Sequence, residues 1–290
     1  MVLDLKNRAK PIIKWAGGKS GLLAQFKEYF PKECNRYIEP FLGGGAVYLS
    51  LKQGIPAIVN DSNAEIINLY KVTTNSPNEL MENLDFLANQ YSEEFYYNLR
   101  SQLPKDKVEM AARAIFLNKT GFNGLYRQNS KGFFNVPFGK RIKCPELYVK
   151  DNLLNVSNRL KQAEIKSQDF EEIIDETKEG DLVYCDPPYE PLSRTSSFNA
   201  YQANGFSQTE QIRLKEACER AANRGAIVLI SNSSAKFILD LYKNFDLKTV
   251  SAKRAINSKG SKRGNVDELL AITLIKPLGK DNKLLSTMSV

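Results

Sequence analysis

Short apolar runs that end at glycine or polar residues recur near both ends of the chain, and they restrict its fold more than any other feature. The runs are residues 37–41, 57–59, 181–185, 226–230 and 269–275. Continuous runs of this length are typical of strands buried on both faces, as in a parallel sheet. Helical patterns lie between them, such as Gln208 to Arg224, which has Ile212, Leu214, Cys218, Ala221 and Ala222 on roughly one side. This alternation predicts an α/β doubly wound fold.

The middle of the chain, from Asn63 to about Leu160, has helical patterns and no run of the buried-strand type. Glu93 to Leu103 and Val108 to Lys119 are the clearest helices. A turn-rich stretch with aromatic and basic residues follows them. We therefore predict a discontinuous core, residues 1–62 and 161–280, interrupted by a mostly helical inserted domain, residues 63–160, and followed by a loose tail, residues 281–290.

Composition narrows the chemistry that is open to the chain. Its 41 basic and 33 acidic residues give a net charge of +8, which favours a polyanionic partner. The sequence has no histidine, which excludes histidine triads, His-Cys zinc sites and zinc deaminase chemistry. We therefore expect no metal site.

Cysteine spacing and hydropathy bear on the cellular compartment. Cys34, Cys144, Cys185 and Cys218 are widely spaced without a C-x-x-C pair, as expected for free thiols in a reducing compartment. No apolar run approaches the roughly 18 residues of a membrane helix. Residues 1–10 lack the apolar segment of a signal peptide. We expect a cytoplasmic protein with no membrane contact.

A glycine cluster follows the first apolar run. Residues 38–46 have the form of a strand, a glycine turn and the start of a helix, and glycine allows the backbone to approach a ligand closely. Asp61 lies 18 residues after Gly43, at the end of the next apparent strand, where a carboxylate can accept hydrogen bonds from ribose hydroxyls. The cluster is not G-x-G-x-x-G, so a dinucleotide is not expected. A plain tight turn stays the alternative to a cofactor loop contributed by Glu39, Pro40, Phe41, Gly43 and Gly45.

Gly18-Lys19-Ser20 is similar to the end of a phosphate-binding loop. That motif needs a glycine five residues before Gly18, where Ile13 stands, so a Walker-type ATPase is not expected. Trp15 has two interpretations, core packing or a wall of the cofactor pocket.

Asp186-Pro187-Pro188-Tyr189 directly follows an apolar strand and is the motif with the clearest chemistry. Two prolines cannot continue a central strand, and their fixed φ aims a backbone carbonyl rigidly. A carboxylate and a carbonyl that accept the two N–H bonds of an exocyclic adenine amine would direct its lone pair at a sulfonium methyl group. Asp186 would stabilise the developing positive charge, and Tyr189 would offer a face to a base flipped out of the duplex. The alternative is a proline turn with a solvent-facing acid.

Cys185 is a possible nucleophile for cytosine C5 methylation, but that chemistry needs a proline-then-cysteine turn. Here Cys185 precedes the acid and is expected to pack in the strand. Cys144-Pro145 has the reverse order.

With these motifs in place, the chain resembles the DNA adenine methylase (Dam) family of N6-adenine methyltransferases of the D12 class. The matching blocks, in the order of the family, are residues 14–19, 39–45, 60–61, 123–127, 134–139, 184–193 and 266–270. Two departures are the triple glycine 43–45 and Phe122, where a tyrosine often stands in the family.

The resemblance implies a Rossmann-like, S-adenosylmethionine-dependent methyltransferase core with an inserted, mostly helical DNA-recognition domain that carries a β-hairpin. It implies cofactor contacts from Trp15, Lys19, Asp61 and Asp186, with Lys19 reaching the methionine carboxylate. It also implies double-stranded DNA with the site GATC as substrate, and a location close to the nucleoid of a bacterial or phage-infected cell. We expect a monomer, acting alone or beside a restriction endonuclease that cuts the same site without forming a complex.

Residues 121–143 carry five basic residues, no acidic one and interleaved aromatic residues, as suits DNA contact. Residues 129–132 predict a turn between 125–127 and 133–136, and a hairpin of this size can enter a major groove. We assign Arg127 to a guanine, because arginine pairs with guanine O6 and N7, and Leu125 and Pro137 to the thymine methyl. Lys14, by resemblance, reads the outer guanine. The full set of expected DNA contacts is Lys14, Phe122, Asn123, Leu125, Arg127, Asn135, Pro137, Lys140 and Arg141.

Two more segments have expected roles in holding DNA. Residues 251–265 again contain five basic and no acidic residues, and we expect a loop that grips phosphates. Residues 192–205 are expected to form a flap over the flipped base. The alternative for each basic cluster, residues 121–143 and 251–265, is a solvated face, and for residues 192–205 it is an ordinary surface loop.

Other functions are weighed against this one. An N4-cytosine methyltransferase would use the same logic, but those enzymes more often have serine where Asp186 stands. An RNA or protein amine methyltransferase would lack the basic hairpin, and the protein-modifying ones favour asparagine at this position. A DNA-binding module without activity would require a broken Asp186 or cofactor loop, and neither is broken.

Overall fold

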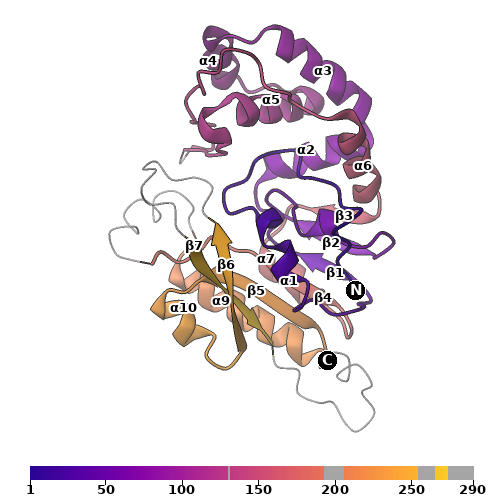
Figure 1. The fold of residues 1–290 in the computed structure, drawn as a ribbon, viewed down its shortest axis with the longest axis vertical. Coiled ribbons are helices and arrows are strands. Elements are labelled where there is room, and N and C mark those ends of the chain that lie inside the picture. Colours follow the sequence, from indigo (N-terminus) through magenta and orange to yellow (C-terminus); the bar gives the residue numbers. More distant parts are fainter. Residues whose placement is uncertain (130, 193–205, 254–264, 274–290) are drawn as a thin grey trace.

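Seven strands form one sheet in the described part of the chain, in the order β3-β2-β1-β4-β5-β7-β6 (Figure 1). The structure is a computed structural model that describes residues 1–129, 131–192, 206–253 and 265–273. The strands are β1 (Tyr37–Glu39), β2 (Ala57–Asn60), β3 (Ala163–Lys166), β4 (Leu182–Cys185), β5 (Ile227–Ser233), β6 (Asp246–Lys253) and β7 (Asn265–Ile272). β1 to β5 pair in parallel, and β7 is antiparallel to β5 and β6. The protein is a mixed α/β fold with a mostly parallel sheet.

Each of the five predicted apolar runs coincides with or overlaps a strand. The expectation of a parallel sheet was wrong for the last run, because β7 is antiparallel to its neighbours. β3 and β6 were not predicted, because both strands mix apolar and charged residues and so form no continuous apolar run. Both lie at the edges of the sheet, where one side of the strand is not covered by a neighbour.

The two faces of the sheet are buried by different residues, because side chains alternate along each strand. Ile38, Ile58 and Val183 belong to a buried cluster shared with α7 (Phe170–Asp175), α9 (Gln208–Asn223) and α10 (Lys236–Leu241). Tyr37 and Val59 belong to a second buried cluster that includes α1 (Leu23–Phe26) and the helices of the middle region. Both faces are therefore apolar, as the continuous runs predict.

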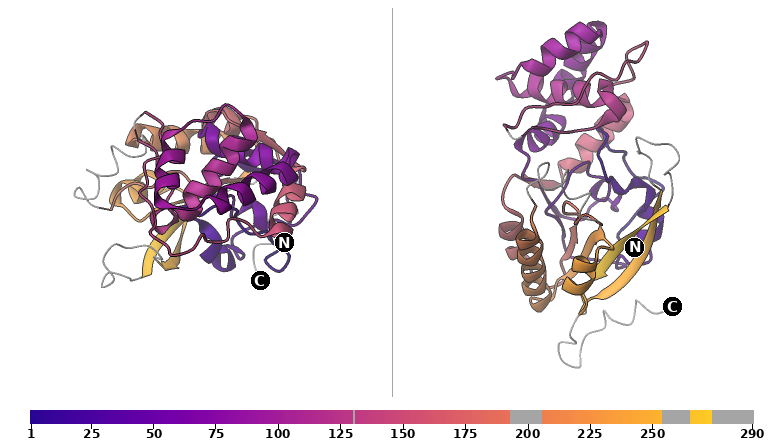
Figure 2. Two further views of the ribbon diagram at one scale, coloured as in Figure 1. Left: turned by 90° about the horizontal axis from the view of Figure 1, so that it is seen from above. Right: turned by 90° about the vertical axis from the view of Figure 1, so that its left-hand side faces the viewer.

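The middle region is helical, as predicted, and no strand occurs in its described residues. Its helices are α2 (Ala64–Asn75), α3 (Pro77–Asn89), α4 (Glu93–Ser101), α5 (Lys107–Thr120) and α6 (Lys150–Leu160). α3, α4 and α5 gather at one end of the molecule, and the sheet with α7, α9 and α10 forms the other (Figures 1 and 2). Because one hydrophobic cluster runs from the sheet into these helices, they pack against the core directly. The domain boundaries at residues 62 and 161 stay a prediction.

Helix α9 agrees with its predicted bounds within one residue, but its buried face differs from the expected one. Leu214, Cys218 and Ala221 are buried as predicted, whereas Ile212 is 41% exposed. The neighbouring Gln211 is fully buried in its place. A buried amide needs hydrogen-bond partners, and those of Gln211 lie beside the turn after β4.

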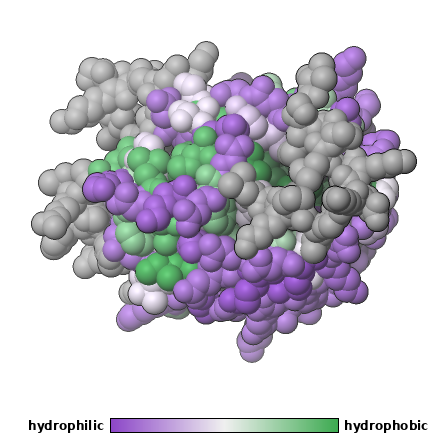
Figure 3. Space-filling view, turned by 90° about the horizontal axis from the view of Figure 1, so that it is seen from below, coloured by the Kyte–Doolittle hydropathy of each residue, from purple (hydrophilic) through white to green (hydrophobic). Residues whose placement is uncertain are grey.

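The surface at the end of the sheet away from α3 to α5 carries hydrophilic residues along one side and a group of hydrophobic residues near its middle (Figure 3). No helix among the described residues is long and apolar enough to cross a membrane. Most of the predicted flap and of the second basic loop, and all of the predicted tail, lie outside the described residues.

Arg113 tests the packing of the helical layer. Its side chain is 2% exposed and donates hydrogen bonds to the carbonyls of Leu99 at 3.0 Å and Arg100 at 2.8 Å and to the Glu65 carboxylate at 3.0 Å. Arg113→Met would remove these three hydrogen bonds and the ion pair with Glu65. We expect the free energy of unfolding, measured in urea, to fall by about 3 kcal/mol.

Lys236→Ala is the control, because the ion pair of Lys236 with Asp240 lies on the surface and contributes little. Its unfolding curve should match that of the wild type. If Arg113→Met is as stable as Lys236→Ala, the buried contacts of Arg113 do not stabilise the helical layer.

Candidate active site

The carboxyl ends of β1, β2 and β4 meet at one edge of the sheet. From β1 the chain continues to β2 and β3 on one side, whereas β4 and β5 lie on the other side of β1. A reversal of strand order of this kind opens a crevice outside the carboxyl ends, where ligands bind in open α/β sheets. The structure has a cavity of about 1070 Å³ there, lined by residues that follow all three strands.

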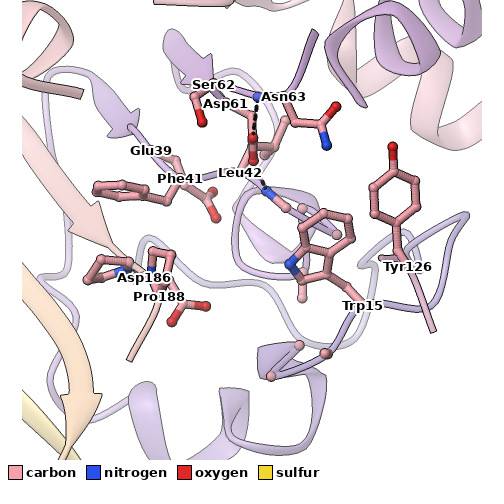
Figure 4. A pocket seen from close by; sticks show the side chains of 18 of the residues that line it. Trp15, Glu39, Phe41, Leu42, Asp61, Ser62, Asn63, Tyr126, Asp186 and Pro188 are labelled. Carbon is pink, nitrogen blue, oxygen red and sulfur yellow. Dashed lines mark hydrogen bonds between the residues drawn. The ribbon is translucent and has the colours of Figure 1, made fainter. Parts of the chain in front are cut away.

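Asp61, at the end of β2, holds the glycine loop after β1. Its carboxylate accepts hydrogen bonds from Gly43 N at 2.8 Å and Asn63 N at 2.9 Å (Figure 4). Burial raises the pKa of Asp61, and the two backbone N–H groups oppose that rise. Gly43 and Asp61, which are 18 residues apart in sequence and follow neighbouring strands, are thereby joined at the wall of the cavity.

Trp15 packs against the same glycine loop, and it both lines the cavity and packs against the hydrophobic core, so both interpretations of this residue hold in part. Its contact with a cofactor stays a prediction. Gly43 and Gly45 have φ values of +47° and +68°, and a Cβ added to Gly43 would lie 2.5 Å from the indole nitrogen of Trp15. Trp15 also lies 5.2 Å from the ring of Tyr126. Glycine at position 43 is therefore required by both the backbone and the close approach of the indole.

Asp186 lies where the turn leaves β4, and Lys19 is its ionic partner. The Lys19 ammonium is 2.7 Å from Asp186 Oδ2 and donates a hydrogen bond to Gly17 O at 2.6 Å. Burial raises the pKa of Asp186, and the nearby Lys19 ammonium opposes that rise. We expected Lys19 to reach a cofactor carboxylate; in the structure it contacts Asp186, and the cofactor contact stays a prediction.

Glu268 on β7 completes this charged group and was missed as a site residue. Tyr189 OH donates to Glu268 Oε2 at 2.8 Å, and the Lys19 ammonium lies 4.0 Å from the same oxygen and 4.9 Å from the centre of the Tyr189 ring. Burial is the main reason that the pKa of Tyr189 is raised well above its usual value. Residues 266–270 are a block of the family resemblance, which is the one sequence signal for Glu268.

Glu39, the last residue of β1, and Pro40 and Phe41, which follow it, line the cavity and also make contacts that stabilise the fold. Glu39 is buried and accepts hydrogen bonds from Tyr37 OH at 2.8 Å and Tyr48 N at 3.1 Å. Burial raises the pKa of Glu39 well above its usual value. Pro40 O accepts from the side chain of Asn60 at 3.0 Å. The ring of Phe41 packs against Phe170 and Phe206, which also line the cavity.

Cys185 takes no part in the site. It is fully buried in β4, and its sulfur lies 4.0 Å from that of Cys218, on the sheet face covered by α9. Burial raises the pKa of the Cys185 thiol well above its usual value. This confirms that Cys185 packs in the strand. Among the described residues, no group of three or more Cys, Asp or Glu side chains is placed to hold a metal ion.

The segments on either side of the predicted turn at residues 129–132 are antiparallel, and their pairing is limited to isolated bridges in the described residues. Asn129 N donates to Phe133 O at 2.8 Å, and Asn135 N donates to Arg127 O at 3.0 Å. The exposed Arg127 side chain is held along this hairpin, because its Nε donates to Asn135 Oδ1 at 2.7 Å. Arg127 and the preceding Tyr126 line the same cavity as Asp186.

Further predicted DNA contacts lie next to this hairpin. Phe122 is 49% exposed and its N–H donates to Pro137 O at 2.8 Å. Asn123 has a left-handed backbone, with φ of 54°. The Lys14 side chain packs on Gly124, whose added Cβ would lie 2.2 Å from Lys14 Cδ.

The remaining predicted contacts differ in how far they are exposed. Lys140 and Arg141 follow the bridge between Gly121 and Phe138 and are exposed. Leu125 is only half-exposed, because part of its side chain packs on the hydrophobic core.

A polar cluster around Glu65 joins the hairpin to α2. The Glu65 carboxylate accepts hydrogen bonds from Tyr126 OH, Arg113 and the side chain of Gln128, the last at 3.0 Å. Gln128 in turn accepts one from the side chain of Asn63 at 3.3 Å. This cluster was not predicted from the sequence, because its members are far apart in the chain and match no motif.

Trp15 is the only tryptophan in the sequence, so tryptophan fluorescence reports on the surroundings of this one indole beside the glycine loop. Gly43→Ala places a methyl group where the indole lies, and it also strains a backbone with positive φ. We expect the emission to shift to longer wavelength and acrylamide quenching to increase, because the indole is pushed into solvent.

Gly54→Ala is the matched control, since Gly54 has a φ of +88° but nothing within 4 Å of an added Cβ. It should leave the emission spectrum unchanged. Identical spectra for Gly43→Ala and wild type would show that Trp15 does not pack on this loop.

Comparison with known proteins covers most of the chain. Residues 15–256 match the family described as D12 class N6 adenine-specific DNA methyltransferase. The chain is 44% identical over 276 residues to the type II methyltransferase M.MjaIII of Methanocaldococcus jannaschii, covering 88% of this chain and 95% of that protein. It is 40% identical over 273 residues to the type II methyltransferase M1.LlaDCHI of Lactococcus lactis subsp. cremoris, covering 91% and 95%.

The DNA adenine methylase of Escherichia coli K12 is 36% identical over 272 residues, covering 92% of this chain and 95% of that protein. The motifs alone leave open whether the methylated amine belongs to adenine or to cytosine. The family match decides this choice for adenine. The chain belongs to the D12 class of N6 adenine-specific DNA methyltransferases.

Proposed function

We propose that this adenine-specific DNA methyltransferase transfers the methyl group of S-adenosylmethionine to the N6 amine of an adenine within GATC, after that adenine is flipped out of the duplex. The observation that carries the proposal is the position of Asp186. Its carboxylate lies at the end of β4, in a cavity shared with the glycine loop and with Arg127 of the hairpin. Catalytic, cofactor and base-reading groups thus share one space.

The residues around the cavity fit S-adenosylmethionine by their chemistry. The Asp61 carboxylate suits ribose hydroxyls, and the Trp15 and Phe41 rings suit an adenine ring. Lys19 suits the carboxylate of the amino acid part, and glycines 43 and 45 leave room for close approach of the backbone. When bound, this cofactor supplies a methyl group on a positively charged sulfur. Methylation of adenine by this family supports the assignment.

Asp186 and a carbonyl of the proline turn would act on the amine of the target adenine. Each would accept a hydrogen bond from one N–H group of the amine, so that the nitrogen lone pair points away from the ring and into the cavity. Positive charge that develops on the nitrogen is stabilised by the Asp186 carboxylate, which forms no covalent bond to the substrate. Burial raises the pKa of Asp186, and the Lys19 ammonium 2.7 Å away opposes that rise and favours the charged form of this carboxyl.

The tyrosine and the hairpin would hold the DNA around that amine. The Tyr189 ring is fixed by the Glu268 carboxylate and offers its face to the flipped base. Arg127 is held by Asn135 on the exposed side of the hairpin, as a base-reading arginine needs to be. Support for GATC comes from this arginine and from the resemblance to the Dam family, and the contacts of Lys14, Phe122 and Pro137 belong to the same proposal.

Asp186→Ala tests the catalytic assignment. Without the carboxylate, we expect methyl transfer in a single-turnover assay to fall at least about 100-fold, because preorganised charge stabilisation is lost. Duplex binding, measured by fluorescence anisotropy, should persist. Asp186→Asn, which keeps the shape and one acceptor oxygen, should retain more activity than Asp186→Ala. Turnover near the wild-type rate in Asp186→Ala would overturn the mechanism.

Arg127→Ala tests base reading. We expect it to lose about 1–3 kcal/mol of discrimination at one guanine, measured as the ratio of kcat/KM on GATC to kcat/KM on duplexes with that pair replaced.

Lys131→Ala, at the exposed tip of the same hairpin, is the control. It should weaken binding to all sequences alike, with a smaller dependence on salt. An unchanged preference for GATC in Arg127→Ala would refute the assignment of this arginine.

A further inference from the structure

The carbonyl of Pro188 in the catalytic turn is held by a buried glutamine of α9. Gln211 Nε2 donates to Pro188 O at 2.9 Å, and Gln211 is fully buried. Two prolines provide no N–H group for a conventional turn hydrogen bond, so the orientation of their peptide groups depends on outside partners. A glutamine in the otherwise apolar buried face of α9 supplies such a partner.

Asn232 on β5 fixes the orientation of that glutamine. Asn232 Nδ2 donates to Gln211 Oε1 at 3.0 Å, and Asn232 Oδ1 accepts from Glu190 N at 3.2 Å and Ser233 N at 2.8 Å. Because an amide side chain donates at one end and accepts at the other, these bonds determine which way each amide points. The turn is thus held on both sides of Tyr189, at Pro188 O by Gln211 and at Glu190 N by Asn232.

We propose that Gln211 and Asn232 are positioning residues of methyl transfer, which direct the carbonyl of Pro187 at the target amine by holding that of Pro188 away from it. In the described residues, no donor bonds Pro187 O, whereas Pro188 O is occupied. Pro187 O is therefore the second acceptor beside the Asp186 carboxylate. This inference rests on the proposed catalytic role of the turn.

Gln211→Met tests the clamp, by which we mean the hydrogen bond from Gln211 to Pro188 O. Methionine has a similar length and is apolar, but it cannot donate to Pro188 O. We expect the single-turnover rate at saturating cofactor and DNA to fall about 10- to 100-fold, since a misplacement of about 1 Å costs that much. The KM for S-adenosylmethionine and the affinity for GATC duplex should stay at wild-type values. A purely structural role would instead lower stability or binding and leave this rate unchanged.

Gln208→Met is the matched control. Gln208 lies three residues earlier in the same helix, and its amide donates to the side chain of Glu190 at 2.7 Å, not to the backbone of the turn. Its rate should equal that of the wild type. Loss of rate in Gln208→Met to the same extent as in Gln211→Met would overturn the proposal.

Asn232→Asp provides the second variant. It keeps the acceptor for Glu190 N but removes the donor to Gln211 Oε1. We expect a slower rate, and little further loss when it is combined with Gln211→Met, because both act through one contact. Thermal unfolding of each variant is measured first; if Gln211→Met does not fold, the rate of Asn232→Asp decides.

A wild-type rate in a folded Gln211→Met, or independent and additive losses in the double variant, would overturn the proposal. The Asp186→Ala result distinguishes failure of the proposed function from failure of the clamp alone. Activity in Asp186→Ala removes the proposed function itself, whereas an inactive Asp186→Ala beside a fully active Gln211→Met removes only the clamp.

Discussion

Two neighbouring parallel strands, β1 and β4, lead the chain to opposite sides of the sheet, and the crevice at their carboxyl ends is the constraint on which the site depends. The glycine loop enters the crevice from β1 and the Asp186 turn from β4. A buried lysine joins the two halves, because Lys19 pairs with Asp186 while Trp15 of the same segment packs on Gly43. Placing these charges out of water is costly, and it is tolerated because each has a partner.

The helical layer is tied to this crevice through polar contacts as well as through the hydrophobic core. Glu65 of α2 binds Tyr126 and Gln128, which flank Arg127 in sequence. Asn63, which caps α2, contacts Gln128 with its side chain and Asp61 with its backbone. The base of the hairpin therefore has a fixed position relative to the glycine loop. Such a connection suits an enzyme that places one base of a bound duplex opposite a cofactor.

Whether the position and role of a residue can be predicted from the sequence depends on whether its partners are near it in the chain or are brought to it by the fold. Strands β1, β2, β4 and β5 were predictable because central strands are continuously apolar, and Gly43, Asp61 and Asp186 followed from them as residues at strand ends. Edge strands β3 and β6 carry charged residues and gave no such signal. Glu268 lies 79 residues from its partner Tyr189, and Gln211 was hidden in a helix face expected to be apolar. Their roles appear only once the sheet brings those segments together.

The most direct test of the account is the chemical identity of the product. The protein is incubated with S-adenosylmethionine labelled in its methyl group and a duplex with a single GATC, and the DNA is then digested to nucleosides. The account predicts that all label is found in N6-methyladenine, and that a duplex in which 2-aminopurine replaces both adenines of the GATC site, one on each strand, takes up none. Label in N4-methylcytosine, or equal labelling of adenines outside GATC, would contradict it.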